Sequence, residues 1–150
     1  MDAPQIVRLT RADVEAWIAM RRQLLAMPEA EHKSETDAWL TRPDRLALGA
    51  RAADGMWIGF IEVGTRDVAE GCDTSPVAYI EALWVDASAR RQGVARRLVE
   101  AAVDWCGERG YAELASDVEL ENTVSQRAHE GLGFEETERL VTYRMDLRKR

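Results

Sequence analysis

The 150-residue sequence has few cysteines and no long hydrophobic run, and each shortage excludes a class of protein. Cys72 and Cys106 are too few for a disulfide framework, so free thiols in a reducing cytoplasm are expected. Neither cysteine has the spacing of a metal site, and no metal is expected. The longest apolar stretch is far short of the ~20 residues that span a bilayer. The N-terminus shows no secretory signal, so neither export nor a membrane partner is predicted.

Basic residues are also outnumbered: 20 lysines and arginines face 27 aspartates and glutamates, for a formal net charge of −7. A nucleic-acid-binding protein needs a basic surface, so no DNA or RNA partner is expected. The acidity favours a cationic substrate, and a role limited to solubility is the alternative. The length and the 46% apolar content suit one globular domain over residues 1–150.

Apolar periodicity and turn residues predict an α/β fold. Strands are predicted at 6–9, 46–52, 56–64, 77–85, 111–115 and, as a pair around Glu136, within 134–147. Helices are predicted at 12–26, 35–40 (a short piece), 93–109 and between Asn122 and Gly133. Asp54-Gly55 predicts a tight hairpin turn. This order indicates a mixed, mostly antiparallel central sheet with helices on both faces.

The segment Arg90-Arg91-Gln92-Gly93-Val94-Ala95 lies between an apolar strand and an amphipathic helix. A turn from strand into helix leaves backbone N–H groups unpaired, and the helix dipole adds positive charge there. The arginines at 90, 91, 96 and 97 add further positive charge. The segment therefore predicts a pyrophosphate site for a nucleotide or coenzyme A, at the strand end where α/β sheets bind ligands.

Two common phosphate-binding motifs are absent from the sequence. It contains no G-x-x-x-x-G-K-[ST] segment, and no G-x-G-x-x-G segment follows the first strand. Arg90 to Ala95 instead match the pattern [Q/R]-x-x-G-x-[G/A]. Through this loop and the block from Asn122 to Phe134, the chain resembles the GNAT superfamily of acetyl-coenzyme A-dependent N-acetyltransferases over most of its length.

A closer resemblance is carried by several linked segments. They are Gly71-Cys72-Asp73-Thr74-Ser75-Pro76, Glu81-Ala82-Leu83-Trp84-Val85, Ala115-Ser116-Asp117, Glu121-Asn122-Thr123-Val124-Ser125-Gln126 and Gly133-Phe134-Glu135-Glu136-Thr137-Glu138-Arg139. In these the chain is similar to the aminoglycoside 6′-N-acetyltransferases. The resemblance implies the GNAT fold and acetyl transfer from acetyl-CoA to the 6′-amine of an aminoglycoside by direct attack in a ternary complex. It also implies antibiotic resistance and a homodimer, in which the last strands pair or exchange between subunits.

The resemblance implies which residues bind acetyl-CoA. The pyrophosphate would contact backbone amides of Arg91, Gln92, Gly93, Val94, Ala95 and Arg96. The pantetheine arm would lie like an added strand along Leu83, Trp84 and Val85. Asn122 would bind near the pantetheine, and a plain helix N-cap is the alternative. The backbone N–H of Leu83 would stabilise the oxyanion.

Glu81 is the expected general base. A carboxylate with the apolar neighbours Ile80 and Ala82 is costly to bury unless it is paired or has a task. The alternative is a side chain that faces solvent. The resemblance implies that Glu81, Asp117 and Glu138 bind the cationic substrate. The alternative for Asp117 is an aspartate that only forms a turn, and the alternative for Glu138 is a surface residue of a strand.

The acid that protonates the leaving thiolate is open. Many GNAT enzymes have a tyrosine four residues before the glycine of the last Gly-Phe pair, and His129 occupies that position here. His129 and Tyr143 are the candidates. Alternatively, His129 is only a surface residue of its helix and Tyr143 is only an aromatic residue of a sheet. The thiolate can also take its proton from water. Leu25 and Val68 stand where some relatives carry aromatic residues, so the antibiotic range is open.

Two other functions stay open at this point. The first is a GNAT enzyme that acetylates another cationic amine, such as a polyamine or a protein. The second is a non-catalytic acyl-CoA sensor that controls a partner through dimer contacts. A sensor would need neither Glu81 nor Asp117.

Overall fold

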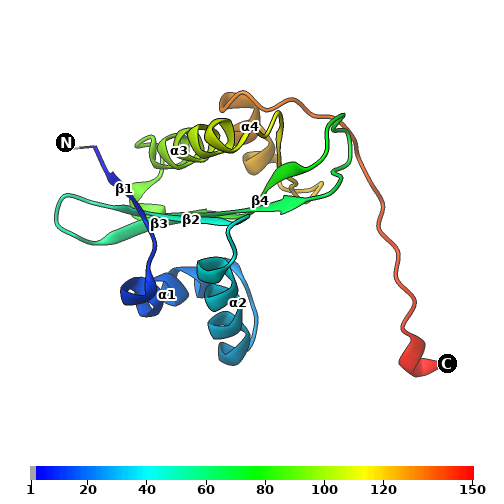
Figure 1. Ribbon diagram of the computed structural model, residues 1–150, viewed down its shortest axis with the longest axis horizontal. Helices are drawn as coiled ribbons and strands as arrows, with labels where there is room; N and C mark the ends of the chain where they lie inside the picture. Colours follow the sequence, from blue (N-terminus) through cyan, green and yellow to red (C-terminus); the bar gives the residue numbers. More distant parts are fainter. Residues whose placement is uncertain (1–2) are drawn as a thin grey trace. The chain divides into compact units, whose positions relative to one another are not determined.

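The computed structural model describes residues 3–150 (Figure 1). The chain divides into two compact units, unit 1 ending at Asp117 and unit 2 comprising Val118–Arg150. The strands, all in unit 1, are β1 (Gln5–Arg8), β2 (Leu46–Arg51), β3 (Trp57–Arg66), β4 (Val77–Val85) and β5 (Leu114–Ala115). The helices of unit 1 are η1 (Arg11–Asp13), α1 (Val14–Leu24), α2 (Glu29–Thr41), η2 (Ala87–Ala89) and α3 (Val94–Arg109). Unit 2 contains α4 (Thr123–Gly131) and η3 (Leu147–Lys149).

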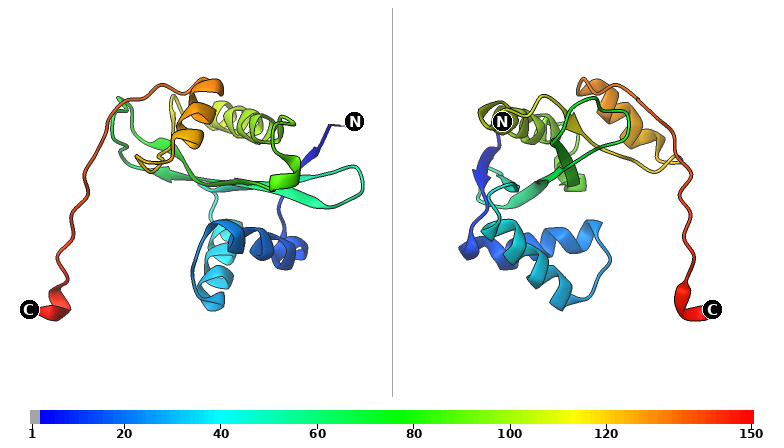
Figure 2. Two further views of the ribbon diagram at one scale, coloured as in Figure 1. Left: turned by 180° about the vertical axis from the view of Figure 1, so that it is seen from behind. Right: turned by 45° about the vertical axis from the view of Figure 1, so that its right-hand side comes forward.

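The five strands form one sheet in the order β1-β2-β3-β4-β5. All neighbours are antiparallel except β4 and β5, which are parallel. Helices α1 and α2 cover one face of the sheet and α3 covers the other (Figure 2). The predicted mixed sheet with helices on both faces is therefore confirmed. Within residues 3–150, no helix has the length and apolar character needed to cross a membrane.

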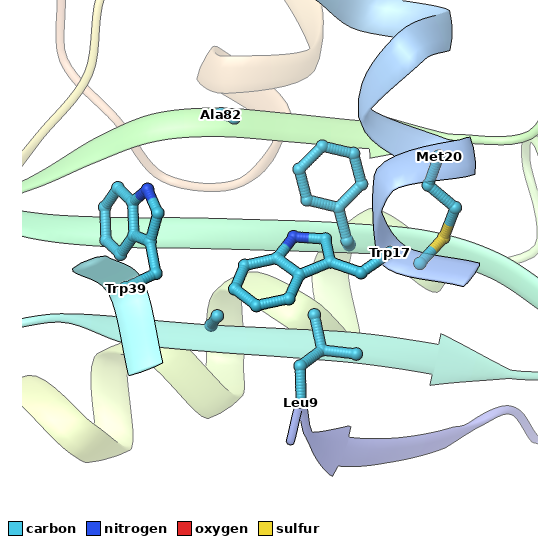
Figure 3. Close-up of a cluster of buried hydrophobic side chains, with 7 residues drawn as sticks. Leu9, Trp17, Met20, Trp39 and Ala82 are labelled. Carbon is cyan, nitrogen blue, oxygen red and sulfur yellow. The ribbon is translucent and has the colours of Figure 1, made fainter. Parts of the chain in front are cut away.

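Both faces of the sheet bury apolar side chains. On the face covered by α1 and α2, large side chains interlock between the helices and the strands (Figure 3). This cluster consists of Leu9, Trp17, Met20, Trp39, Ala47, Phe60 and Ala82. On the opposite face, α3 buries Val94, Leu98 and Ala102 at helical spacing. The hairpin predicted at Asp54-Gly55 is present, with Gly55 in the left-handed region at φ 89°.

Helix α2 is longer than the piece predicted at 35–40. It begins at Glu29, directly after Pro28, and the acidic residues of its first turn suit the positive end of the helix dipole. Its buried residues, His32, Thr36 and Trp39, recur at helical spacing. Of these three residues only Trp39 is strongly apolar. A prediction based on the spacing of hydrophobic residues therefore underestimates the length of the helix.

The two strands predicted within 134–147 are absent, and that prediction is wrong for this structure. The segment from Phe134 to Asp146 forms no helix or strand. A strand needs a neighbouring strand to pair its backbone groups, and residues 118–150 contain no other strand. The strand predicted at 111–115 is also shorter, and it is limited to Leu114–Ala115 where it pairs with β4.

A buried charged cluster joins α1, α2 and β3. The guanidinium of Arg21 is fully buried, and it donates hydrogen bonds to the carboxylates of Glu62 and Glu35 and to Nδ1 of His32, the last at 3.1 Å. Trp17 Nε1 also donates to Glu62, at 2.9 Å. Burial raises the pKa of Glu62, while its contacts with Arg21 and Trp17 act in the opposite direction. Arg21 therefore compensates a carboxylate that the fold has removed from water.

We predict that Arg21→Met lowers the free energy of unfolding by ~3–5 kcal/mol, because Glu62 is left buried without its cation. Equilibrium unfolding in urea measures this loss. Arg22→Met is the matched control, since Arg22 is the next residue of α1 and pairs with Glu29 at the surface. Its unfolding midpoint should equal that of the wild type. Equal midpoints for both variants would contradict the assignment.

Candidate active site

The loop between β4 and α3 has the backbone geometry of an anion site. Gly93, the residue before α3, has φ 77°, and Arg91 has φ 63°, which few non-glycine residues adopt. No described residue accepts a hydrogen bond from the backbone N–H of Gly93, Val94 or Ala95. A Cβ atom placed on Gly93 would meet nothing within 4 Å, so the space beside these donors is open. The loop can therefore hold a phosphate at a helix N-terminus.

Side chains of the loop hold it in this shape. Asp86 accepts a hydrogen bond from the backbone N–H of Ser88 at 3.0 Å and caps η2. Gln92 Nε2 donates to the Ser88 carbonyl at 3.2 Å, and Arg90 Nε donates to the Val85 carbonyl at 3.4 Å. The predicted amide donors, from Arg91 to Arg96, thus follow a turn that is tied to the end of β4.

One edge of β4 lacks a neighbouring strand over most of its length. Along its other edge β4 pairs with β3 from Val77 to Val85, whereas β5 pairs only with Ala78 and Tyr79. Beyond these two residues, no described strand lies against this edge. Leu83, Trp84 and Val85 lie in this part of β4 and are half-buried. An extended ligand that carries amides can therefore pair with the strand there.

Glu81 is the extra residue of a β-bulge. Glu62 is paired with Ala82 and Val63 is paired with Ile80, so Glu81 has no partner on β3. Ala82 packs in the core cluster on the α1 and α2 face. The Glu81 side chain reaches the same face, because a Cβ on Gly64 would lie 3.6 Å from its Cγ atom and 3.4 Å from the Trp39 ring of α2. Simple alternation would place the Glu81 side chain on the face opposite that of Ala82. The bulge instead turns it toward α1 and α2, on the same face as Ala82.

A cleft of about 510 Å³ lies where Glu81 emerges in unit 1. Three carboxylates line it, those of Glu35, Glu62 and Glu81. Trp39 and Leu25 are apolar parts of the wall. Arg45 lines the cleft as well, but the three carboxylates outnumber it, and this excess of negative side chains favours cationic ligands.

A chain of contacts links Glu81 to Asp117. Arg66 donates to both carboxylate oxygens of Glu81, and its guanidinium carbon lies 3.5 Å from the centre of the Tyr79 ring. The Tyr79 hydroxyl in turn donates to Asp117. Burial, followed by this contact with Asp117, raises the pKa of Tyr79 above its ordinary value. Glu81 and Asp117, which are 36 positions apart in the sequence, are thus joined through two side chains.

The remaining predicted residues belong to unit 2. Asn122 caps α4, because its side chain accepts a hydrogen bond from the Ser125 N–H at 3.1 Å. His129 Nδ1 donates to the Ser125 carbonyl at 2.8 Å. Glu138 is exposed, and so is Tyr143, with 91% of its surface accessible. Neither is in a strand, which corrects their predicted setting, and the proposed roles of all four residues stay predictions.

Four residues of the site are missing from the sequence-based prediction: Glu35, Glu62, Arg66 and Tyr79. The signal that identified Glu81, a carboxylate between apolar strand residues, also applies to Glu62, which lies between Ile61 and Val63. No comparable signal marks Arg66, since an arginine at a strand end is normally a solvated residue.

A protein-family model for the acetyltransferase (GNAT) family matches residues 13–134. The chain belongs to this family. It is 42% identical to the aminoglycoside N(6′)-acetyltransferase type 1 of Serratia marcescens, over 95% of this chain and 99% of the relative. It is 40% identical to the enzyme of the same name from Salmonella typhimurium, over 93% and 97% of the two chains.

Solved structures agree with this assignment. One is the aminoglycoside acetyltransferase AAC(6′)-Iy in complex with a bisubstrate analogue of coenzyme A and acetylneamine. It has a TM-score of 0.92 and 37% identity, over 97% of this chain and 99% of that one. Another is AAC(6′)-Ih from Acinetobacter baumannii, with a TM-score of 0.91 and 32% identity, over 96% and 99% of the two chains.

We predict that Gly93→Asp raises the dissociation constant of coenzyme A at least ~10-fold, because a carboxylate would stand beside the phosphate donors. Isothermal titration calorimetry measures the constant. Gly93→Asn is the control, since asparagine has the same shape, carries no charge and tolerates left-handed backbone. It should bind more tightly than the aspartate variant. Equal dissociation constants for the two variants would place the diphosphate elsewhere.

Proposed function

We propose that the protein is an acetyl-CoA-dependent aminoglycoside 6′-N-acetyltransferase that confers antibiotic resistance. The observation that carries the proposal is the bulged Glu81, which points into a carboxylate-lined cleft from a strand with a free edge. The full-length identity to enzymes of this name supports it. The solved relative with a bisubstrate analogue supports the same pair of substrates.

The β4–α3 loop and the free edge of β4 are the proposed acetyl-CoA site. The N–H groups of Gly93, Val94 and Ala95, which donate to none of the described residues, suit the pyrophosphate. Residues 83–85 offer backbone groups to the amides of the pantetheine arm. This arrangement brings a thioester along β4 toward Glu81, and the N–H of Leu83 is the proposed oxyanion donor.

Glu81 is the proposed general base. An aminoglycoside amine is protonated at neutral pH, so it must lose a proton before it attacks the thioester carbonyl. A carboxylate that reaches this ammonium directly or through a water can take the proton. Glu35, which shares the Arg21 cation with Glu62, lines the same cleft, and Asp117 is a further carboxylate that is bonded to Tyr79. The site thus attracts the charged form of the substrate and then provides a base that neutralises it.

The proposal extends to the whole chain as one enzyme. The family match from residue 13 to residue 134 continues across the boundary after Asp117, which supports a single functional domain. Cys72 and Cys106 are free thiols, and burial raises the pKa of Cys106 to about 11. Unreactive free thiols suit a reducing cytoplasm, the proposed location.

We also propose that the enzyme is a homodimer that pairs through the C-terminal segment. This segment exposes four large apolar side chains that alternate with polar residues: Val141, Tyr143, Met145 and Leu147. This alternation is typical of a strand with one buried face. A second copy would provide both the backbone partner and the apolar cover that this segment needs.

We predict that Glu81→Gln lowers kcat/KM for tobramycin by ~10²–10⁴, because glutamine cannot take the proton. Asp117→Asn should lower it in the same direction. The assay follows thiol release from acetyl-CoA. Glu70→Gln is the control, since this exposed residue removes one charge without lining the cleft. Calorimetry should show unchanged coenzyme A affinity in every variant.

The outcome separates the proposed function from its rivals. Turnover of polyamines but not of aminoglycosides would indicate an enzyme for another cationic amine. Tight coenzyme A binding without turnover of any amine would indicate an acyl-CoA sensor. A Glu81→Gln enzyme with wild-type kcat/KM would remove the proposed base.

We predict that the wild-type protein sediments as a dimer at micromolar concentration. Val141→Asp combined with Met145→Asp should give a monomer, because the charges would lie on the apolar side of the alternating segment. Thr142→Asp is the matched control on the polar side, and it should leave the dimer intact. Analytical ultracentrifugation measures all three. A monomeric wild type would refute the dimer.

A further inference from the structure

The proposed base, Glu81, is already paired with a cation, the guanidinium of Arg66. Arg66 Nε donates to Glu81 Oε1 at 2.9 Å, and Arg66 Nη2 donates to Oε2 at 2.8 Å. Such a bidentate pair occupies the side of the carboxylate that faces the guanidinium. A base must come within hydrogen-bond reach of the ammonium whose proton it takes. The acceptor amine and Arg66 therefore compete for the same two oxygen atoms.

The exposure of this pair makes exchange possible. The side chains of Arg66 and Glu81 are 44% and 34% exposed, so water can solvate both groups when they separate. Arg21 and Glu62, a second arginine–carboxylate pair at the cleft, are 0% and 2% exposed. Separation there would leave buried charges without compensation. Of these two pairs, only Arg66–Glu81 is suited to open during substrate binding.

Arg66 keeps other favourable contacts if it leaves Glu81. Its guanidinium lies over the Tyr79 ring, a cation–π contact that does not involve Glu81. The hydrogen bonds with Glu81 are the main cause of the raised pKa of Arg66, and the carboxylate of Asp117, which accepts a hydrogen bond from Tyr79, adds a weaker electrostatic attraction. The guanidinium can therefore remain on the ring beside Asp117 while an ammonium takes its place on Glu81.

We propose that Arg66 is the resident counter-ion of Glu81, and that a substrate ammonium binds by exchanging with it. This inference rests on the proposed function and adds a residue that sets its specificity. Because one cation replaces another, Glu81 is never left without a cation, and a neutral group gains nothing by approaching it. Arg66 thus favours highly charged acceptors and weakens their ground-state binding by occupying their site.

Arg66→Gln tests the exchange, because glutamine removes the competing charge and keeps a polar side chain. Its dissociation constant for tobramycin, measured by calorimetry on enzyme saturated with coenzyme A, should fall about tenfold (~1.4 kcal/mol). KM for tobramycin should fall in parallel, with a smaller change in kcat. Arg66→Lys is the matched control. It keeps the charge but cannot form the bidentate contact with Glu81, so its dissociation constant should lie between those of the wild type and of the glutamine variant.

A purely structural role predicts the opposite sign. If Arg66 only orients Glu81, the glutamine variant binds tobramycin with equal or lower affinity, and that result would overturn the inference. Wild-type turnover of tobramycin together with such a result would refute the exchange but keep the proposed function. A wild type that acetylates no aminoglycoside would refute both.

A crystal structure of the wild-type enzyme with tobramycin and coenzyme A gives a test that does not depend on a variant. The expected complex has a tobramycin nitrogen within hydrogen-bond distance of a Glu81 carboxylate oxygen and the Arg66 guanidinium still over Tyr79. Persistence of both Arg66–Glu81 hydrogen bonds in that complex would rule out the exchange.

Discussion

The buried contact between Arg21 and Glu62 is the constraint on which the cleft depends. Glu62 lies on the central strand β3, where a lone carboxylate would be strongly unfavourable, and the guanidinium of Arg21 on α1 compensates it. The same guanidinium holds Glu35 and His32 of α2. One buried cation thus ties both helices to the sheet, and with them the wall of the cleft. Burying these charges costs free energy, and the contacts of Arg21 that compensate this cost also hold the wall in place.

The second constraint is the irregular pairing of β4. A bulge at Glu81 turns its carboxylate toward the cleft, and the short pairing with β5 leaves the end of the strand open along one edge. Both features weaken a regular sheet, since they remove backbone partners. They occur where a site needs a side chain in an unusual direction and main-chain groups available to a ligand. The loop before α3 continues this edge with unpaired N–H groups.

Prediction from the sequence succeeds where the signal is local. Strand β4 and helix α3 were predicted nearly residue by residue, because a continuous apolar run and a regular amphipathic stripe determine them. The left-handed turn before α3 also follows from a local signal, the one glycine between these elements. Helix α2 was underestimated, because its buried side includes His32 and Thr36, which are held by polar contacts. The last strands were wrong, since period-two alternation cannot supply a partner strand.

The sequence by itself determined the family, strand β4 with its carboxylate, helix α3 and the glycine of the loop between them. Those features depend on residues that are neighbours in the chain. Only the tertiary structure decided that Glu81 is the bulged residue, that Glu62 is neutralised by Arg21, and that Arg66 and Tyr79 join Glu81 to Asp117. These contacts connect residues 13 to 41 positions apart. Their electrostatic interactions and hydrogen bonds become strong only when folding removes water and brings these side chains within a few ångströms of one another.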